Sequence, residues 1–309
     1  MRCPFLREAQ VKSCQASAYR KMIARSSVHA GNERCLSEDY VHCPSVKQLH
    51  EELPSHSRCP FLEESLVQFC AAAPVTKYIP YTESLRSRCI SGRHRYCELY
   101  LVLAHPRKNS GSRPEEGVDG LAVPEELYYS RSHLWLDVNE DGICQIGIDA
   151  LLAHVLGPVE KVTFLSAKGG ARPTAVLTVG GVDLHIVLPN TLPLVEPNTH
   201  LRADPARLTS DPYGLGWLFE GAETRRPEGE VSPLTAGLLR GKEAREWLRA
   251  DLHRISACVH EILSRPGGTG DRILNDGGLI APGTLQLLPR EGSLTLFNEF
   301  FSPYAGLRR

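Results

Sequence analysis

The sequence has no long apolar run, and no stretch of it approaches the ~18 apolar residues that a membrane-spanning helix needs. It also has no excess of charge of either sign, because Lys+Arg 35 stands against Asp+Glu 36. This balance gives no reason to expect nucleic acid or an anionic membrane as a partner. The first residues lead directly into charged ones, without the apolar core of a secretory signal. We therefore expect a cytoplasmic protein whose partners are proteins.

Catalytic signatures are also missing. The chain contains no P-loop, no glycine fingerprint of a dinucleotide-binding fold, no serine nucleophile elbow and no HExxH motif. His133, His154 and His185 lack metal-ligand spacing, and we interpret them as structural histidines. The sequence predicts no enzymatic activity, although a redox accessory role stays open.

Cysteine, in contrast, is abundant: the chain has 10, and eight of them lie before residue 98. A cytoplasmic chain should keep most of these thiols reduced. They belong to an internal repeat, because Cys3-Pro4-Phe5-Leu6 returns 56 residues later as Cys59-Pro60-Phe61-Leu62. In both units the cysteines are 11, then about 20, then 8 residues apart. The repeat predicts a duplicated small module over residues 1–104, with units at about 3–43 and 59–97.

Four cysteines per repeat favour one four-thiolate metal site in each unit, since thiolates select zinc or iron–sulfur clusters. The spacing lacks the CxxC pairs of zinc fingers, and Cys-Pro pairs lean towards iron–sulfur. A helix over residues 5–14 would separate Cys3 and Cys14 by roughly 16 Å, so the chain must turn for the ligands to meet. Buried thiols or disulfides of a duplicated helical hairpin are the alternatives. The candidate metal ligands are Cys3, Cys14, Cys35, Cys43, Cys59, Cys70, Cys89 and Cys97.

The rest of the chain divides by composition. Residues 105–126 are rich in turn formers and are expected to be a linker. Residues 127–221 contain short apolar–polar alternations typical of antiparallel strands, with one small helix. Residues 222–309 begin as a second linker and continue as an amphipathic helix, with apolar residues at three- and four-residue steps over 244–262. The apolar tail at 294–301 is expected to pack on this helix or on the middle domain.

Three motifs of the middle domain resemble a known family. They are Tyr129-Ser130-Arg131-Ser132-His133-Leu134-Trp135-Leu136, Gln145-Ile146-Gly147-Ile148-Asp149 with Leu156-Gly157-Pro158-Val159, and Asp211-Pro212-Tyr213-Gly214-Leu215-Gly216-Trp217-Leu218-Phe219. By these motifs, residues 127–220 resemble the H-protein of the glycine cleavage system, whose closing segment reads Asp-Pro-Tyr-Gly-x-Gly-Trp. The resemblance implies an antiparallel β-sandwich. With the cysteine module before it and the helical segment after it, the expected fold class is α+β.

The H-protein resemblance also implies a lipoyl-lysine at the tip of a β-hairpin. Counting back from Pro189, which matches the proline after that hairpin, this position falls on Gly181. Glycine has no amine to carry lipoate, and Thr178 occupies the place of the acidic residue that precedes the family's lysine. Lys168 is a weak alternative, and Lys161 is expected to be a solvated strand residue. We therefore expect no lipoate.

Together these patterns predict a binding, scaffold or regulatory protein that is H-protein-like, not lipoylated, and equipped with metal-binding or redox-sensing cysteine repeats. Its expected partners include the enzymes that dock H-proteins. Two other hypotheses stay open. One is an iron–sulfur electron-transfer component, and the other is a lipoyl carrier that uses a different lysine.

Overall fold

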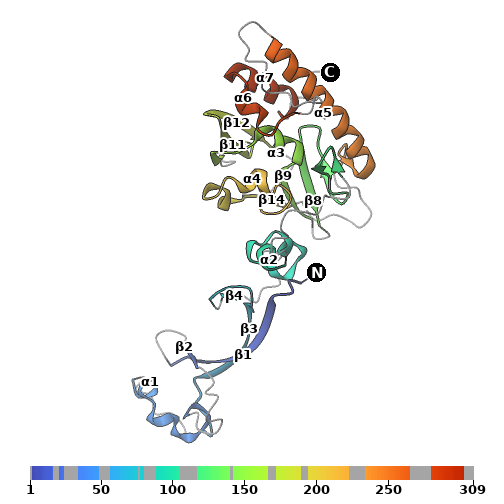
Figure 1. The fold of residues 1–309 in the computed structure, drawn as a ribbon. Helices are drawn as coiled ribbons and strands as arrows, with labels where there is room; N and C mark the ends of the chain where they lie inside the picture. Colours follow the sequence, from blue (N-terminus) through green and yellow to red (C-terminus); the bar gives the residue numbers. More distant parts are fainter. Residues whose placement is uncertain are drawn as a thin grey trace. The chain divides into compact units, whose positions relative to one another are not determined.

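The chain divides into two compact units, Met1–His94 and Arg95–Arg309, and each is described here by itself (Figure 1). The computed structural model describes residues 2–16, 21–23, 34–48, 56–75, 77–79, 88–104, 117–139, 142–165, 172–188, 194–222, 234–264 and 280–302. Among these residues, no helix combines the length and the apolarity needed to cross a membrane.

The first unit contains a four-stranded antiparallel sheet in the order β2-β1-β3-β4. Its central strands are β1 (Leu6–Cys14) and β3 (Leu62–Cys70), and its outer strands are β2 (Lys21–Ile23) and β4 (Lys77–Ile79). Each repeat therefore supplies one central and one outer strand, and the repeats meet in the middle of the sheet.

The strand register makes the two repeats symmetric. Leu6 lies opposite Cys70, Gln10 opposite Leu66, and Cys14 opposite Leu62. Because each residue of β1 matches the residue 56 positions later in β3, this register relates the two strands by a local two-fold axis at the Gln10–Leu66 pair. The outer strands follow the same rule, with Lys12 opposite Ile23 and Gln68 opposite Ile79.

The helix considered over residues 5–14 is wrong, because this segment is strand β1. Its backbone groups pair along nine residues with the equivalent segment of the other repeat. Long-range pairing of this kind overrides local preference, since what a strand needs is a partner edge. The helical-hairpin alternative for the repeat fails for the same reason. After the strands, the repeats continue in short turns: η1 (Arg34–Leu36), η2 (Glu38–His42) and α1 (Pro44–Lys47) in the first, and η3 (Arg88–Ile90) and η4 (Gly92–Tyr96) in the second.

The second unit is built on two antiparallel sheets, one of six strands and one of three. One has the order β13-β14-β9-β8-β7-β15 and the other β10-β11-β12. The strands are β7 (Tyr128–Tyr129), β8 (Leu134–Val138), β9 (Ile143–Ile148), β10 (Lys161–Leu165), β11 (Thr174–Val179), β12 (Val182–Val187), β13 (Leu194–Pro197), β14 (Phe219–Ala222) and β15 (Leu239–Arg240). The two sheets share one core. In it, the rings of Phe164 and Phe219 pack edge to face, with 5.3 Å between their centroids.

Helices complete this unit. They are α2 (Glu98–Ala104), α3 (Ala150–Leu156), the 3-10 turn η6 (Thr199–Arg202), α4 (Arg207–Ser210), α5 (Gly241–Ser264), α6 (Thr284–Leu287) and α7 (Arg290–Phe300). Asp149 caps α3 by accepting a hydrogen bond from the N–H of Leu152 at 2.8 Å. The apolar tail packs as expected, since Phe297, Phe300 and Phe301 are buried in the same core as α5.

The α+β class with antiparallel sheets is confirmed. The boundary between the units follows His94, before the end of the expected cysteine module at residue 104. Within the expected linker, strands β5 (Gly117–Val118) and β6 (Leu121–Ala122) form a small sheet, and Val118 is fully buried in the core of the second unit. Residues 105–116 of that linker lie outside the described residues.

Candidate functional site

The hairpin of β11 and β12 is the place where the sequence predicts the lost lipoyl position. Val179 lies opposite Val182, so Gly180 and Gly181 alone form the turn. Both have positive φ angles, 56° and 71°, which is the type I′ geometry of tight hairpins. Thr178 donates a hydrogen bond from its hydroxyl to the carboxylate of Asp183 at 2.8 Å. The turn is therefore short, regular and without an amine.

The candidate lysines lie elsewhere. Lys161 is exposed on β10, where it lies opposite Thr178. Lys168 lies outside the described residues, as does Pro189. A Cβ atom on Gly181 would meet no atom within 4 Å, so this side of the turn faces open space.

The C-terminal segment lies against the other side of the turn. A Cβ atom on Gly180 would lie 3.8 Å from Gln286 of α6, an ordinary contact distance. The side-chain amide of Gln286 donates to the carbonyl oxygens of Leu156 at 3.0 Å and Pro158 at 2.7 Å. Helix α6 thus joins the hairpin turn to the loop that follows α3, and Figure 1 shows it beside these elements.

Two glycines allow this close approach. A Cβ atom on Gly157 would lie only 2.5 Å from the Cα of Gly283, a distance that real Cβ atoms do not show. The N–H of Gly283 donates to the carbonyl of His154 at 2.8 Å, and the ring Nε2 of His154 lies 2.8 Å from the carbonyl oxygen of Ile280. The backbone of the C-terminal segment is therefore fixed directly to α3.

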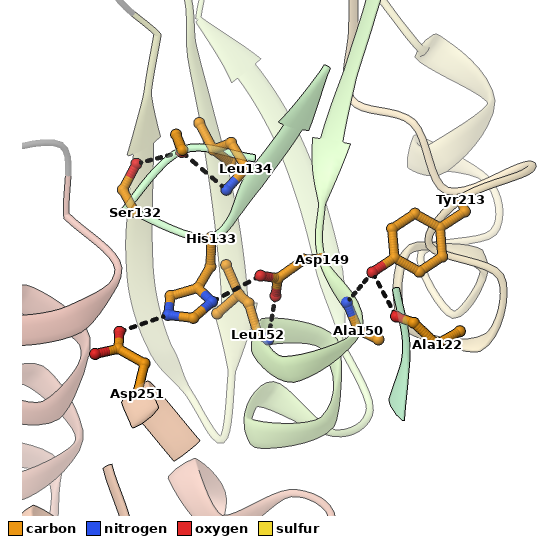
Figure 2. A network of polar contacts seen from close by, with 10 residues as sticks. Ala122, Ser132, His133, Leu134, Asp149, Ala150, Leu152, Tyr213 and Asp251 are labelled. Carbon is orange, nitrogen blue, oxygen red and sulfur yellow. Dashed lines mark hydrogen bonds and ion pairs between the residues drawn. The ribbon is translucent and has the colours of Figure 1, made fainter. Parts of the chain in front are cut away.

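A buried charge network forms the second polar feature of this unit (Figure 2). His133 is fully buried between two carboxylates, with Nδ1 2.7 Å from Asp149 and Nε2 3.1 Å from Asp251. Asp149 is the cap of α3, whereas Asp251 comes from α5, 118 residues after His133. Arg254 donates a further hydrogen bond to Asp251. The network therefore connects the β-domain to the long C-terminal helix.

The charge of His133 follows from these neighbours. Burial lowers its pKa, because desolvation disfavours the imidazolium. The charge and hydrogen bond of Asp149, followed by those of Asp251, outweigh burial and raise the pKa of His133 to about 9. The imidazolium is thus the stable form at neutral pH, held between two acceptors.

The closing motif makes its own network around Tyr213 and Trp135. Tyr213 donates its hydroxyl to the carbonyl of Ala122 at 2.9 Å and accepts from the N–H of Ala150 at 3.0 Å (Figure 2). The indole N–H of Trp135 donates to the carbonyl of Pro212 at 3.1 Å. Trp135 and Trp217 are almost wholly buried, at 0% and 3% exposure. Both tryptophans are core residues, and the closing motif has a structural role.

The predicted metal ligands fall in different places. Seven belong to the first unit, while Cys97 belongs to the second. None of the cysteines forms a disulfide in this structure. Among the described residues, no three histidine, cysteine, aspartate or glutamate side chains stand close enough together to hold a metal ion as they are. Cys59 nevertheless lies near Cys14 and Cys43 of the other repeat.

Sequence reasoning missed the residues that come from far along the chain. Asp251 is a polar residue on the inner face of an amphipathic helix, and this break in its apolar stripe was the available signal. Gln286 and Gly283 gave no signal in a short segment without periodicity. His133, interpreted as structural, is buried and partnered on both nitrogens.

Comparisons with known proteins agree with this geometry. A family model for the glycine cleavage H-protein matches residues 127–246 and so extends into α5. The glycine cleavage system H protein of Thermobifida fusca is 33% identical over 118 residues, which are 37% of this chain and 91% of that protein. The H protein of Neisseria meningitidis serogroup A is 34% identical over 103 residues, 32% of this chain and 79% of its own.

Among solved structures, the glycine cleavage system H protein of Mycobacterium marinum aligns with a TM-score of 0.31 and 26% identity, covering 42% of this chain and 98% of that one. The match to the Thermobifida fusca protein covers 91% of that H protein, and the residues that match the family model include the motifs around His133, Gly147 and Tyr213. Through residues 127–246, this chain belongs to the glycine cleavage H-protein family.

Proposed function

We propose that the protein is a non-lipoylated, H-protein-like docking or regulatory protein, with N-terminal cysteine repeats that bind metal or sense redox state. The observation that carries this proposal is the Gly180–Gly181 turn at the tip of the β11–β12 hairpin. A group carrier of this family needs a side-chain amine there, and a glycine turn supplies none.

The surroundings of the turn support a docking role. Thr178, in the place of the family's acidic residue, is engaged with Asp183. Gln286 of the C-terminal segment lies beside Gly180, where an added Cβ atom would be 3.8 Å from it, and it donates a hydrogen bond to Leu156 at the end of α3. The segment therefore stabilises the hairpin in one position, which suits a fixed recognition surface better than a mobile arm.

The β-surface around the hairpin keeps its fold without the lysine. Hydrogen bonds of Trp135 and Tyr213 fix the closing motif to β8, to the start of α3 and to β6. Leu165, at the end of β10, is 49% exposed in a strand of the hairpin sheet. An enzyme that recognises this surface can bind without receiving a lipoyl group, and the protein would then compete with lipoylated H-proteins for the same enzymes.

The first test is the intact mass of the protein from lipoate-replete cells. We expect no lipoyl increment on the wild-type chain. Gly181→Lys should be modified poorly, although its side chain would face open space, because Thr178 does not present the acidic residue. The double change Thr178→Glu and Gly181→Lys restores both positions and should be modified more. Stoichiometric lipoate on Lys161 or Lys168 would instead restore the carrier hypothesis.

The second test measures docking directly. The purified protein is titrated against the glycine cleavage enzymes of its own organism, in competition with their lipoylated H-protein. We expect saturable inhibition that Leu165→Glu weakens and Val102→Glu, equally a change of an exposed apolar residue, does not. Absence of binding to each of these enzymes would contradict the docking role and leave the shared fold.

A further inference from the structure

The cysteines of the first unit converge across the two repeats rather than within each one. The N–H of Cys59 donates to the carbonyl of Cys35 at 2.9 Å, and the N–H of Gln15 donates to the carbonyl of Phe61 at 2.9 Å. The strand register places Cys14 opposite Leu62. The Cys59-Pro60-Phe61-Leu62 loop of the second repeat therefore lies beside cysteines of the first.

Side-chain contacts give the same result. Cys59 is buried in a small core with Tyr40 and Val46, against which Cys35 and Cys43 pack. Burial is the main cause of the raised pKa of Cys59, and the nearby side chains of Cys14 and Cys43 contribute to it, so both lie close to this thiol. Four thiols that are spread over 46 residues of sequence, from 14 to 59, thus gather at one end of the sheet.

Burial raises the pKa of the Cys59 thiol above its ordinary value, and backbone amides of its own loop offset only part of this effect. The backbone N–H groups of Phe61 and Leu62 donate hydrogen bonds to its sulfur, and the N–H of Leu62 also lies 3.1 Å from the carbonyl of Cys59. Amide donors aimed at a sulfur stabilise its negative charge, and they are a recurring feature around metal-bound cysteines. No described histidine or carboxylate is needed to complete a set of four soft ligands.

We propose that Cys14, Cys35, Cys43 and Cys59 form one metal site for zinc or iron, with three ligands from the first repeat and one from the second. This inference rests on the metal-binding part of the proposed function and refines it. In place of one site within each repeat, each site takes one cysteine from the repeat across the two-fold axis. The thiols do not stand at ligand distances, so binding requires them to rotate towards one another and to release their protons to solvent.

The two-fold axis gives this site a counterpart at the other end of the sheet. The three backbone hydrogen bonds around Cys59 recur around Cys3: its N–H donates to Cys89 at 2.7 Å, Leu6 donates to Cys3 at 3.1 Å, and Ala71 donates to Phe5 at 2.9 Å. Cys3 and Cys70 are buried there. Cys3, Cys70 and Cys89 therefore belong to a second set of thiols, and Cys3 is separated from its sequence neighbour Cys14.

Double substitutions distinguish exchanged sites from one site per repeat. The full-length protein is purified without oxygen or chelator, and zinc, iron and acid-labile sulfide are measured. In the exchanged arrangement, Cys14→Ser with Cys59→Ser removes no more metal than either change alone, while Cys3→Ser with Cys14→Ser removes the metal of both sets. With one site per repeat, the expectation is reversed: Cys14→Ser with Cys59→Ser removes the metal of both sites, and Cys3→Ser with Cys14→Ser removes no more than either change alone. Cys258→Ser, in α5, serves as the control that should change nothing.

The wild-type chain provides a test that does not depend on folded variants. Metal is withdrawn stepwise with a chelator, and newly accessible thiols are alkylated and located by mass spectrometry. We expect Cys14, Cys35, Cys43 and Cys59 to become labelled together. Labelling of Cys14 together with Cys3, or protein without zinc or iron, would overturn the proposal. Zinc without acid-labile sulfide would indicate a single zinc ion, whereas iron with acid-labile sulfide would indicate an iron–sulfur cluster. Neither measurement involves the glycine turn, so failure of the docking role would leave this result standing.

Discussion

At the scale of single residues, His133 shows how a polar side chain can replace apolar packing. It has a φ angle of 60°, lies fully buried, and has a charged partner on each ring nitrogen. The rings of Trp247 and Phe301 pack against it at 4.7 and 5.0 Å. A buried charge of this kind stabilises the fold only while both of its partners are present.

The pH dependence of stability should reveal His133. Its pKa is about 9 in the folded chain and near the ordinary 6.5 when unfolded, so its contribution is complete below pH 6.5 and is lost as pH rises through 9. The difference corresponds to a contribution on the order of 3 kcal/mol. Asp251→Asn should lower the thermal midpoint strongly at pH 6 and much less at pH 10. Glu243→Gln, exposed on the same helix, is the control, and equal losses at both pH values would contradict this account.

Gly147 gives a second prediction at the residue scale. A Cβ atom there would lie 2.6 Å from the ring of Trp135, which is fully buried and cannot move away without losing its hydrogen bond to Pro212. Gly147→Ala should therefore cost about 1–3 kcal/mol, the usual range for an overpacked core. Chemical denaturation measures the loss. Gly92→Ala, where a Cβ would meet no atom within 4 Å, should be nearly neutral.

At the scale of elements, the C-terminal segment lies beside the hairpin turn. Gln286 donates two hydrogen bonds to carbonyl groups of the loop after α3, and a Cβ atom added to Gly180 would lie 3.8 Å from Gln286. The turn itself is held by the strand pair of Val179 and Val182. We therefore expect the rigidity of this tip to depend on a helix more than 100 residues away in the sequence.

Gln286→Ala should loosen the turn without unfolding the unit. Each hydrogen bond typically contributes about 0.5–1.5 kcal/mol, and two carbonyl groups lose their partner. Hydrogen exchange should accelerate at the amides of the β11–β12 turn. Leu287→Ala, on the same helix at a side chain that is 48% exposed, should leave exchange there unchanged. Equal exchange in both variants would show that α6 only lies beside the turn.

The elements also show which parts the sequence could predict. The apolar–polar alternation at 134–138 and the three- and four-residue steps of α5 are local patterns, and both elements form there. Strand β1 was not predicted, because it depends on a partner segment 56 residues away. The His133–Asp251 contact and the Gly157–Gly283 approach were not predicted either, since contacts between residues more than 100 positions apart leave no local periodicity.

At the scale of the whole molecule, two compact units with separate cores make up one chain. The second unit has a large core that reaches from the sheets to α5 and α7. Among the described residues of the first unit, the core cluster consists of Tyr40, Val46 and Cys59 with a few partly buried neighbours. So small a core supplies little hydrophobic stabilisation, and modules of this size commonly depend on metal or cross-links.

Denaturation should therefore proceed in two steps that respond to different changes. Trp217→Ala should destabilise the second unit by about 3–5 kcal/mol, the typical cost of removing a large buried aromatic side chain. Removal of metal with a chelator should lower the midpoint of the other step, the unfolding of the first unit. Differential scanning calorimetry checks this on the wild-type chain and on Trp217→Ala, each with and without chelator. A single cooperative transition that shifts both with the substitution and with chelator would contradict the independence of the units.

The symmetric register of β1 and β3 has a consequence for the origin of the repeat. The segment that forms the centre of the sheet pairs with its own duplicate about the Gln10–Leu66 position. A peptide holding a single repeat could form the same central pair only with another copy of itself, as an isologous homodimer. The covalent duplication would then have fused the two subunits of an ancestral dimer. The loops at Cys3-Pro4 and Cys59-Pro60 would each contact the half of the sheet that was once the other subunit.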